Sequence, residues 1–304
     1  NLGSITNTGS VSTTTGNGIR TTGTNLGTIN NSGTISSTGS HGIYNYTGTV
    51  TNFINTGTVS GGGANSGLKI GGSYNTNLTN FTNAGTMRST GIGYGVLSNP
   101  VSGTIGTIGT FNNGQGGDAT TAAKTALTYY GKLPTYYNII VKSPTQYGQL
   151  AVTSPLAYTT TFGIYSGGVS GVAASVLAAG TYASVLTGVS SSNILGGTTG
   201  TYGSYGWTLN NVSGTTWDLV VTGGSSGSTG GDTSNSSVSP TVTNVTSGTT
   251  IGLSSIGVSS TPVLAGGTIV LSKGERSSQA LTVLSEGGTI AAPSSGAAQL
   301  SGIH

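Results

Sequence analysis

The chain has 304 residues and a formal net charge of +3, but charged residues make up only 4% of it, against roughly a quarter in ordinary globular domains. Its eight basic residues form no cluster. Because binding to nucleic acid requires a basic stripe, we expect no nucleic-acid partner. The absence of cysteine excludes disulfides and thiolate metal sites. No apolar run reaches the roughly 18 residues that a membrane-spanning helix needs, so we expect no membrane span in this segment.

The polar residues are mainly uncharged. Ser, Thr, Asn and 56 Gly take the place of the usual charged surface. Disordered chains lack β-branched and aromatic residues, whereas Ile, Val, Thr and 14 Tyr recur here at regular places. We therefore predict an ordered protein that is almost entirely β.

The first part of the chain is a repeat. The phrase Asn-x-Gly-[Ser/Thr]-apolar begins at Asn7, Asn31, Asn55 and Asn83, so successive copies are 24, 24 and 28 residues apart. Two further apolar tracks keep step with it. The second track holds Ile19, Ile43, Leu68 and Val96, and the third holds Leu26, Val50, Leu78 and Ile105, followed by Ile29, Ile54, Phe81 and Ile108. Three tracks at a period in the twenties indicate a solenoid.

The repeat predicts a right-handed parallel β-helix with three short strands per turn. One turn cannot bury its own apolar face, so it stacks on the next turn at roughly 4.8 Å. We expect glycine and asparagine at the corners because tight bends need a positive φ. Asparagines at equivalent positions stack into amide ladders, so Asn7, Asn31, Asn55 and Asn83 are predicted to form one.

Changes in composition divide the chain into five parts. Residues 1–112 are the β-helix repeats, and residues 113–135 are a loop or short helix that interrupts them. Residues 136–222 are predicted to form an antiparallel β module, inserted in the β-helix or adjacent to it. Residues 223–240 are a low-complexity, flexible linker, and residues 241–304 resume the β-helix.

Within the module, two alternating runs flank a turn-forming stretch. Gly206–Leu209 and Thr216–Val221 each contain a tryptophan and enclose Asn210–Gly214. This arrangement predicts an antiparallel hairpin.

The sequence offers little for catalysis. Its five acids are Asp118, Asp218, Asp232, Glu275 and Glu286. No two of them are placed as the paired carboxylates of a glycosidase would be. His41 is the one histidine away from the C-terminus, and we interpret it as a corner or surface residue rather than part of a Ser/His/Asp triad. We therefore predict no catalytic site, no cofactor and no metal site.

Two aromatic clusters remain as candidate contacts for a ligand or partner. One holds Tyr129, Tyr130, Tyr136 and Tyr137, and the other holds Tyr202, Tyr205 and Trp207. Exposed aromatic side chains on a rigid scaffold bind sugars or proteins. The alternative, which we favour, is that they pack the seam between the module and the β-helix.

The Asn-x-Gly-Thr-Ile repeats resemble the passenger regions of bacterial autotransporters, as do Ser143–Leu150, Ala179–Tyr182 and Trp217–Val221. The resemblance implies an exported β-helix at the cell surface of a Gram-negative bacterium. A start without Met also leads us to expect a processed or partial piece of a longer protein.

For function, the resemblance implies a non-catalytic structural or adhesive fibre segment, acting in surface attachment or in matrix and biofilm assembly. Its partners would be further copies, associated end to end or laterally, or host and neighbour-cell surface molecules, glycans included. Two alternatives stay open. One is a carbohydrate-active or proteolytic passenger, and the other is a glycan-binding module on residues 136–222.

Overall fold

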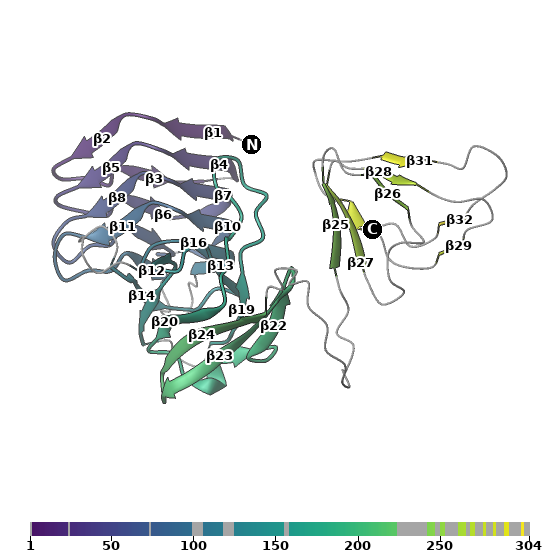
Figure 1. The fold of residues 1–304 in the computed structure, drawn as a ribbon. Helices are drawn as coiled ribbons and strands as arrows, with labels where there is room; N and C mark the ends of the chain where they lie inside the picture. Colours follow the sequence, from purple (N-terminus) through teal and green to yellow (C-terminus); the bar gives the residue numbers. More distant parts are fainter. Residues whose placement is uncertain are drawn as a thin grey trace. The chain divides into compact units, whose positions relative to one another are not determined.

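The computed structural model describes residues 2–23, 25–72, 74–98, 106–117, 125–154 and 158–223, together with the backbone of eight strands between residues 242 and 300. The chain divides into two units, residues 1–224 and 225–304, and each is described by itself. Both consist of β-strands (Figure 1).

The first unit is a solenoid whose strands stack into three sheets. Sheet A has the order β1 (Leu2–Asn7), β4 (Leu26–Asn31), β7 (Gly48–Asn55), β10 (Thr76–Asn83), β13 (Gly106–Asn113), β15 (Tyr136–Ile139), β19 (Thr160–Ile164) and β21 (Ile194–Leu195). Sheet B holds β2 (Ser10–Thr13), β5 (Thr34–Ser37), β8 (Thr58–Gly61) and β11 (Thr86–Ser89). Sheet C begins with β3 (Ile19–Thr21), β6 (Ile43–Asn45), β9 (Leu68–Ile70), β12 (Val96–Ser98), β14 (Leu127–Gly131) and β18 (Leu150–Thr153). The prediction of a parallel β-solenoid is confirmed.

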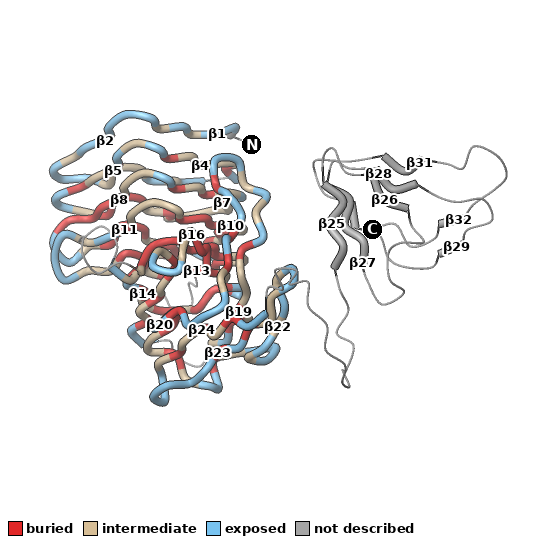
Figure 2. Tube along the Cα trace, viewed as in Figure 1, coloured by how far each residue is buried: buried red, intermediate tan, exposed pale blue. Residues whose placement is uncertain are grey.

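Equivalent residues of successive turns form columns in the solenoid interior. In sheet A, Phe53 pairs in register with Phe81, and Phe81 pairs with Phe111. The rings of Phe53 and Phe81 stack at 5.0 Å between centroids, and those of Phe81 and Phe111 at 4.4 Å. All three are buried, and buried residues run along the inner side of the turns in Figure 2. Stacked phenylalanines therefore form the core of the middle turns.

In two turns, the third apolar track predicted from the sequence names a residue other than the one that occupies the inner column. Phe53, not Ile54, occupies the inner column, because Val50 and Phe53 both point inward with Thr51 and Asn52 outside. One column pairs Leu78 with Ile108, not Ile105. Inward and outward side chains do not alternate strictly along these strands, because two outward residues separate Val50 from Phe53. Counting every second residue from the repeat phrase therefore assigns the wrong residues to the interior.

The solenoid continues beyond residue 112, where the predicted β-helix repeats end. β13 pairs in parallel with β15, β15 with β19, and β14 with β18. Later turns fill the same columns with aromatic residues such as Tyr137 and Phe162, which the repeat phrase does not identify. The predicted interruption at 113–135 thus contains strand β14, while residues 118–124, the centre of the predicted helix, lie outside the described residues.

The antiparallel module is smaller than predicted and is continuous with sheet C. β18 pairs in parallel with β20 (Gly180–Thr187), after which β24 (Thr216–Gly223), β23 (Tyr205–Ser213) and β22 (Thr199–Tyr202) follow in antiparallel order. The predicted tryptophan hairpin is therefore confirmed as β23 and β24. A short antiparallel pair, β16 (Val141–Ser143) and β17 (Gln146–Tyr147), and a 3-10 turn at Ser191–Asn193 complete the unit.

The antiparallel strands close one end of the core. The Trp207 ring meets Phe162 edge-on at 5.5 Å between centroids. The indole nitrogen of Trp217 donates to the Val189 carbonyl at 2.7 Å, and both tryptophans are buried. The inner column of sheet A therefore ends on Trp207 rather than on an open apolar face.

Two kinds of glycine occur at the corners. Gly57, in the repeat phrase, does not have a positive φ. A Cβ at this residue would overlap the carbonyl oxygen of Gly33 in the preceding turn, so close stacking requires glycine here. Gly48, at the corner that enters sheet A, has a φ of 81°. The prediction that corner glycines serve positive φ is thus wrong for Gly57 and right for Gly48.

The second unit contains three small parallel groupings. The first holds β25 (Val242–Thr246), β27 (Thr261–Ala265) and β30 (Thr282–Val283), and the second holds β26 (Thr250–Gly252), β28 (Thr268–Val270) and β31 (Thr289–Ala291). The third pairs β29 (Arg276–Ser277) with β32 (Gln299–Leu300). Parallel pairing between successive segments is what a resumed solenoid requires. The predicted linker at 223–240 lies almost wholly outside the described residues.

Candidate binding face

The asparagines of the repeat phrase form a hydrogen-bonded column at the corner between sheets A and B. Each side-chain amide donates to the next side-chain carbonyl at 2.8 Å, from Asn7 to Asn31, from Asn31 to Asn55, and from Asn55 to Asn83. Asn83 donates in turn to Asn113 at 3.2 Å. The four residues named from the sequence thus belong to a column of five, and Asn31 to Asn113 are fully buried. Their role is to join one turn to the next.

The asparagine column ends at Asn113, because its next partner is not an asparagine. Asn113 donates to the hydroxyl of Tyr137 at 3.3 Å. Asn83 also donates to the side chain of Gln115 at 3.2 Å. Burial raises the pKa of the Tyr137 hydroxyl, so this group stays neutral and can accept the asparagine hydrogen. All of these groups stabilise the fold and none is open to a ligand.

Most of the aromatic residues predicted as ligand contacts instead pack in or against the core. Tyr129, Tyr137 and Trp207 are buried in it. Tyr202 and Tyr205 are half-buried against it, and the Tyr202 hydroxyl donates to the Ser175 carbonyl at 3.0 Å. Trp207 meets Phe162 where the module joins the β-helix, the seam proposed from the sequence. Tyr129 and Tyr137 instead pack against Phe111 within the solenoid itself.

The remaining two predicted contacts lie outside. Tyr136 is 52% exposed on sheet A. Tyr130 is half-buried on the outer side of sheet C, where its ring stacks on Tyr94 at 5.0 Å between centroids.

A group of aromatic and basic side chains lies on the outer side of sheet C, in the first turns. We call it the tyrosine–cation patch, and it consists of Arg20, Tyr44, Tyr46, Lys69 and Tyr74. Arg20 of β3, Tyr44 of β6 and Lys69 of β9 occupy one register position on successive strands. The solenoid therefore aligns one tyrosine between two cations.

Contacts within the patch hold the rings and cations together. The Arg20 guanidinium carbon lies 4.2 Å from the Tyr46 ring centroid, and Lys69 Nζ lies 4.8 Å from the Tyr44 centroid. Tyr44 meets Tyr46 edge-on at 5.3 Å, and Tyr46 meets Tyr74 edge-on at 5.8 Å. Cation–π contacts of this kind keep long basic side chains ordered over the rings.

Burial changes the ionisation of the groups at the centre of the patch. His41, whose ring lies 5.4 Å from Tyr44, has its pKa lowered to about 4, first by burial and then by the nearby Lys69. Its Nδ1 accepts a hydrogen bond from the Ser66 backbone N–H at 3.0 Å, which requires that nitrogen to carry no proton. Burial also lowers the pKa of Lys69 and raises that of Tyr44. At neutral pH the histidine is therefore uncharged, so the charge of the patch comes from its arginine and lysine.

No carboxylate of the described residues offsets this charge. Asp218 is the one acid whose side chain is described, and its Oδ1 accepts from the Ser184 backbone N–H at 2.7 Å. It lies on β24 of the closing module, and no ion pair links it to Arg20 or Lys69. Among the described residues the patch is thus a cationic surface without an internal counter-charge.

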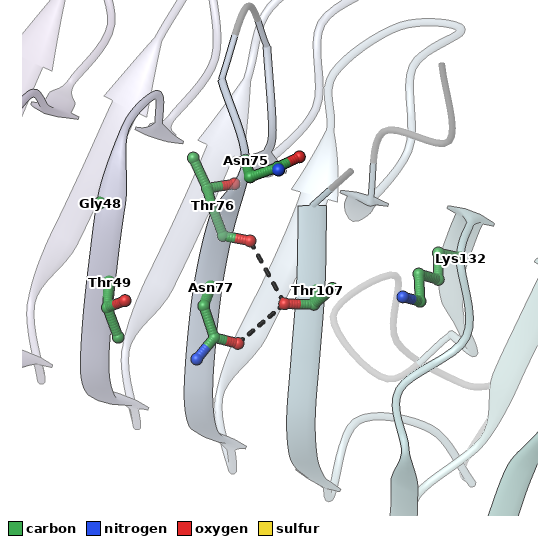
Figure 3. A pocket seen from close by; sticks show the side chains of 7 residues that line it. All are labelled: Gly48, Thr49, Asn75, Thr76, Asn77, Thr107 and Lys132. Carbon is green, nitrogen blue, oxygen red and sulfur yellow. Dashed lines mark hydrogen bonds between the residues drawn. The ribbon is translucent and has the colours of Figure 1, made fainter. Parts of the chain in front are cut away.

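A shallow groove lies where the corner enters sheet A. It is lined by Gly48, Thr49, Asn75, Thr76, Asn77, Thr107 and Lys132 and has a volume of about 480 Å³ (Figure 3). Thr107 donates to the Asn77 side chain at 2.8 Å and to the Thr76 carbonyl at 3.3 Å. Lys132 reaches the groove from the turn after β14, and its Nζ lies 5.3 Å from the Tyr158 ring centroid. The groove presents hydroxyls, amides and one cation.

The patch and the groove are neighbours along the chain. Tyr74 immediately precedes Asn75, and Tyr46 stands two residues before Gly48. The two aromatic side chains therefore lie at the point where the outer side of sheet C gives way to the groove.

The described surface offers cations, tyrosine rings, hydroxyls and amides as contacts for another molecule. Within the described ranges no three His, Asp or Glu side chains gather as a metal site would require. The side chains of His41 and Asp218 each accept a hydrogen bond from a backbone N–H. The described part of the chain also contains no helix with the length and apolar character needed to cross a membrane.

Sequence reasoning missed Arg20, Tyr44, Tyr46, Lys69 and Tyr74. Three of them carry a signal, because each directly follows the inner residue of the second track, Ile19, Ile43 or Leu68. Alternation along a strand turns such a residue outward. Tyr46 and Tyr74 lie in the corners between strands, where the inward–outward alternation of a strand does not predict the direction of a side chain.

Comparison with known proteins adds nothing to this description. No family model matches the chain, no curated protein matches it, and no solved structure matches it. The resemblance to autotransporter passengers therefore stays a prediction.

Proposed function

We propose that this chain is a rigid, non-catalytic segment of an extracellular surface fibre, in the manner of an autotransporter passenger. It acts in attachment of the cell or in assembly of a surface matrix. The observation that carries the proposal is the unbroken stack of asparagines and phenylalanines inside the first unit, from Asn7 to Asn113 and from Phe53 to Phe111. Such a stack fixes outer side chains at regular spacing along a stiff support.

The surface of the chain supports a role outside the cytoplasm. It has no cysteine and few charges, and its outer strands carry hydroxyls and amides in rows. One such row links Asn52 and Asn80 at 3.0 Å on sheet A, and another links Ser12 and Ser36 at 3.2 Å on sheet B. A neutral hydrogen-bonding face of this kind suits contact with hydrated surfaces and glycans.

The closed end limits how copies could associate. Trp207 covers the inner column of sheet A at the end formed by the antiparallel strands. End-to-end stacking through this end would require the module to move away. We therefore propose association of copies through the sides of the solenoid and not through this end.

Display of the chain on a non-adherent Gram-negative host tests the proposal. We expect cells that carry the chain on their surface to attach to glass or to one another more than cells that display an unrelated domain at equal density. If neither attachment nor aggregation rises although antibody labelling shows the chain on intact cells, the proposed function is wrong.

A further inference from the structure

We propose that the tyrosine–cation patch and the adjoining groove bind an acidic polysaccharide, with carboxylates on the cations and sugar rings on the tyrosines. This inference rests on the proposed surface role and names the ligand class.

The first argument is charge. Five basic side chains are described, and three of them, Arg20, Lys69 and Lys132, belong to the patch or the groove. Asp218, the one described carboxylate, is held elsewhere by Ser184. An anion that binds here thus meets positive charge with no described acid to repel it.

The second argument is spacing. Arg20 and Lys69 lie on strands β3 and β9, with β6 between them. Two strand spacings amount to roughly 9.6 Å. Their charged ends lie 5.9 Å and 4.8 Å from the centroid of the Tyr44 ring between them. The two cations thus come from strands on either side of one tyrosine, an order along the solenoid axis that suits a linear polymer with repeated charges.

The third argument is the aromatic surface. Tyr74 is 57% exposed, and Tyr46 is half-buried between it and Tyr44. A tyrosine ring offers a flat apolar surface and a polar hydroxyl, which matches a sugar ring with one apolar face and hydroxyls at its rim. The Gly72 backbone packs against Tyr44 and Tyr46, leaving no room for a Cβ there. The rings are thus held in place before a ligand arrives.

The fourth argument is the groove. Its lining supplies Thr49, Asn77 and Thr107 at one register position on successive strands, with Lys132 on the side of Thr107 (Figure 3). Hydroxyls and amides recognise sugar hydroxyls, and the nearby cation provides a further contact for a carboxylate. A chain of sugars that crosses the tyrosines would continue into this groove.

Nucleic acid fits the same surface less well. Affinity for a phosphate backbone grows with the number of phosphates neutralised, and this face offers three described cations with neutral residues between them. A polymer with few charges and many hydroxyls matches these three cations and the neutral polar groups between them more closely.

Binding of the full 304-residue chain to polygalacturonate, measured by biolayer interferometry, tests the inference. Its methyl ester, which keeps the sugar backbone and removes the charge, is the matched ligand control. We expect the wild-type chain to bind the acid form at least tenfold more tightly than the ester, and added salt to weaken that binding.

Variants test whether the named residues carry the binding. We expect the double variant Arg20→Gln/Lys69→Gln to lose at least tenfold in affinity, and Tyr74→Ala to lose severalfold with the salt dependence retained. Arg88→Gln changes an exposed arginine on sheet B and should bind like the wild type. Circular dichroism spectra must match that of the wild type for each variant.

Several outcomes would overturn the inference. These are equal binding of acid and ester, no binding of either, and undiminished binding by the double variant. Equal, patch-dependent binding of single-stranded DNA or of vesicles of anionic lipid would also overturn it, since the surface would then be a general anion site. Displayed chains that promote attachment equally with and without Arg20 and Lys69 would leave the proposed function standing and reject this ligand.

Discussion

The side chain of Gln115 pairs with both backbone groups of Met87. The Met87 N–H donates to Gln115 Oε1 at 2.7 Å, and Gln115 Nε2 donates to the Met87 carbonyl at 3.1 Å. Met87 lies on β11, the last strand of sheet B. A primary amide carries the same donor and acceptor as a peptide group, so Gln115 takes the place of a missing strand and ends sheet B without leaving Met87 unpaired.

Gln115→Ala should lower the free energy of unfolding by about 2 to 6 kcal/mol. The substitution leaves a buried N–H and a buried carbonyl of Met87 without partners, and each unsatisfied group costs about 1 to 3 kcal/mol. Urea unfolding followed by circular dichroism measures the change. Gln146→Ala, at a half-buried residue of β17, should change stability by less than about 1 kcal/mol. Equal effects of the two variants would show that the Gln115 amide does not end the sheet.

Asn55→Ala should destabilise the solenoid much more than Asn52→Ala, although both residues lie on β7. Asn55 is fully buried between Asn31 and Asn83 in the ladder, whereas Asn52 bonds to Asn80 on the outer side. We expect a loss of about 3 kcal/mol for Asn55→Ala and less than about 1 kcal/mol for Asn52→Ala, because only the first leaves buried amides unpaired. Thermal unfolding of both variants measures the difference, and similar midpoints would contradict the assigned role of the ladder.

Gly57→Ala and Gly9→Ala make the same chemical change in the same repeat phrase. A Cβ at Gly57 overlaps the backbone of the turn before it, while a Cβ at Gly9 has open space around it. We expect Gly57→Ala to cost about 3 kcal/mol or more, since backbone overlap forces two turns apart, and Gly9→Ala to be nearly neutral. Urea midpoints of the two variants measure the contrast. A neutral Gly57→Ala would mean that the turns do not stack as closely as the structure shows.

Stability should fall as the pH is lowered from about 6.5 to about 4 because of His41. Its folded-state pKa, about 4, lies below the ordinary 6.5, so in this interval the unfolded chain takes up a proton and the folded chain does not. The contribution is complete above pH 6.5 and is lost as the pH falls through 4. Each pKa unit corresponds to about 1.4 kcal/mol. Allowing for partial hydration of the ring, we expect a loss on the order of 2 kcal/mol.

Unfolding midpoints measured at pH 7, 5.5 and 4 test this dependence. The variant His41→Gln keeps a hydrogen-bond acceptor for Ser66 and removes the titrating group, so its midpoint should vary less across the same range. A wild-type midpoint that is constant from pH 7 to pH 4 would contradict the lowered pKa.

The repeat phrase predicts the early turns because each of its residues has one structural task. Asn55 binds the turns above and below it, and Gly57 allows them to approach. The phrase does not recur after the copy at Asn83, and beyond Phe111 the aromatic residues Tyr137 and Phe162 occupy the inner column of sheet A. Local sequence does not reveal that these residues occupy the same positions as Phe53 and Phe81, because their alignment depends on pairing across the sheet.

The candidate site could be predicted only in part for a related reason. Whether a tyrosine is core or surface depends on register, and a shift by one residue reverses it. Tyr129 is buried and the next residue, Tyr130, lies outside, so a cluster of tyrosines in the sequence does not define a surface. Arg20 and Lys69 are 49 residues apart and share one face only because the turns stack in register.

Attachment of the native cells in the presence of Fab fragments raised against this chain tests the proposed function most directly. We predict that the Fab fragments label intact cells and reduce the number that attach to a surface, in proportion to the labelling. Labelling of broken cells alone, or full labelling of intact cells with unchanged attachment and aggregation, would contradict the proposal that this solenoid acts as an adhesive segment at the cell surface.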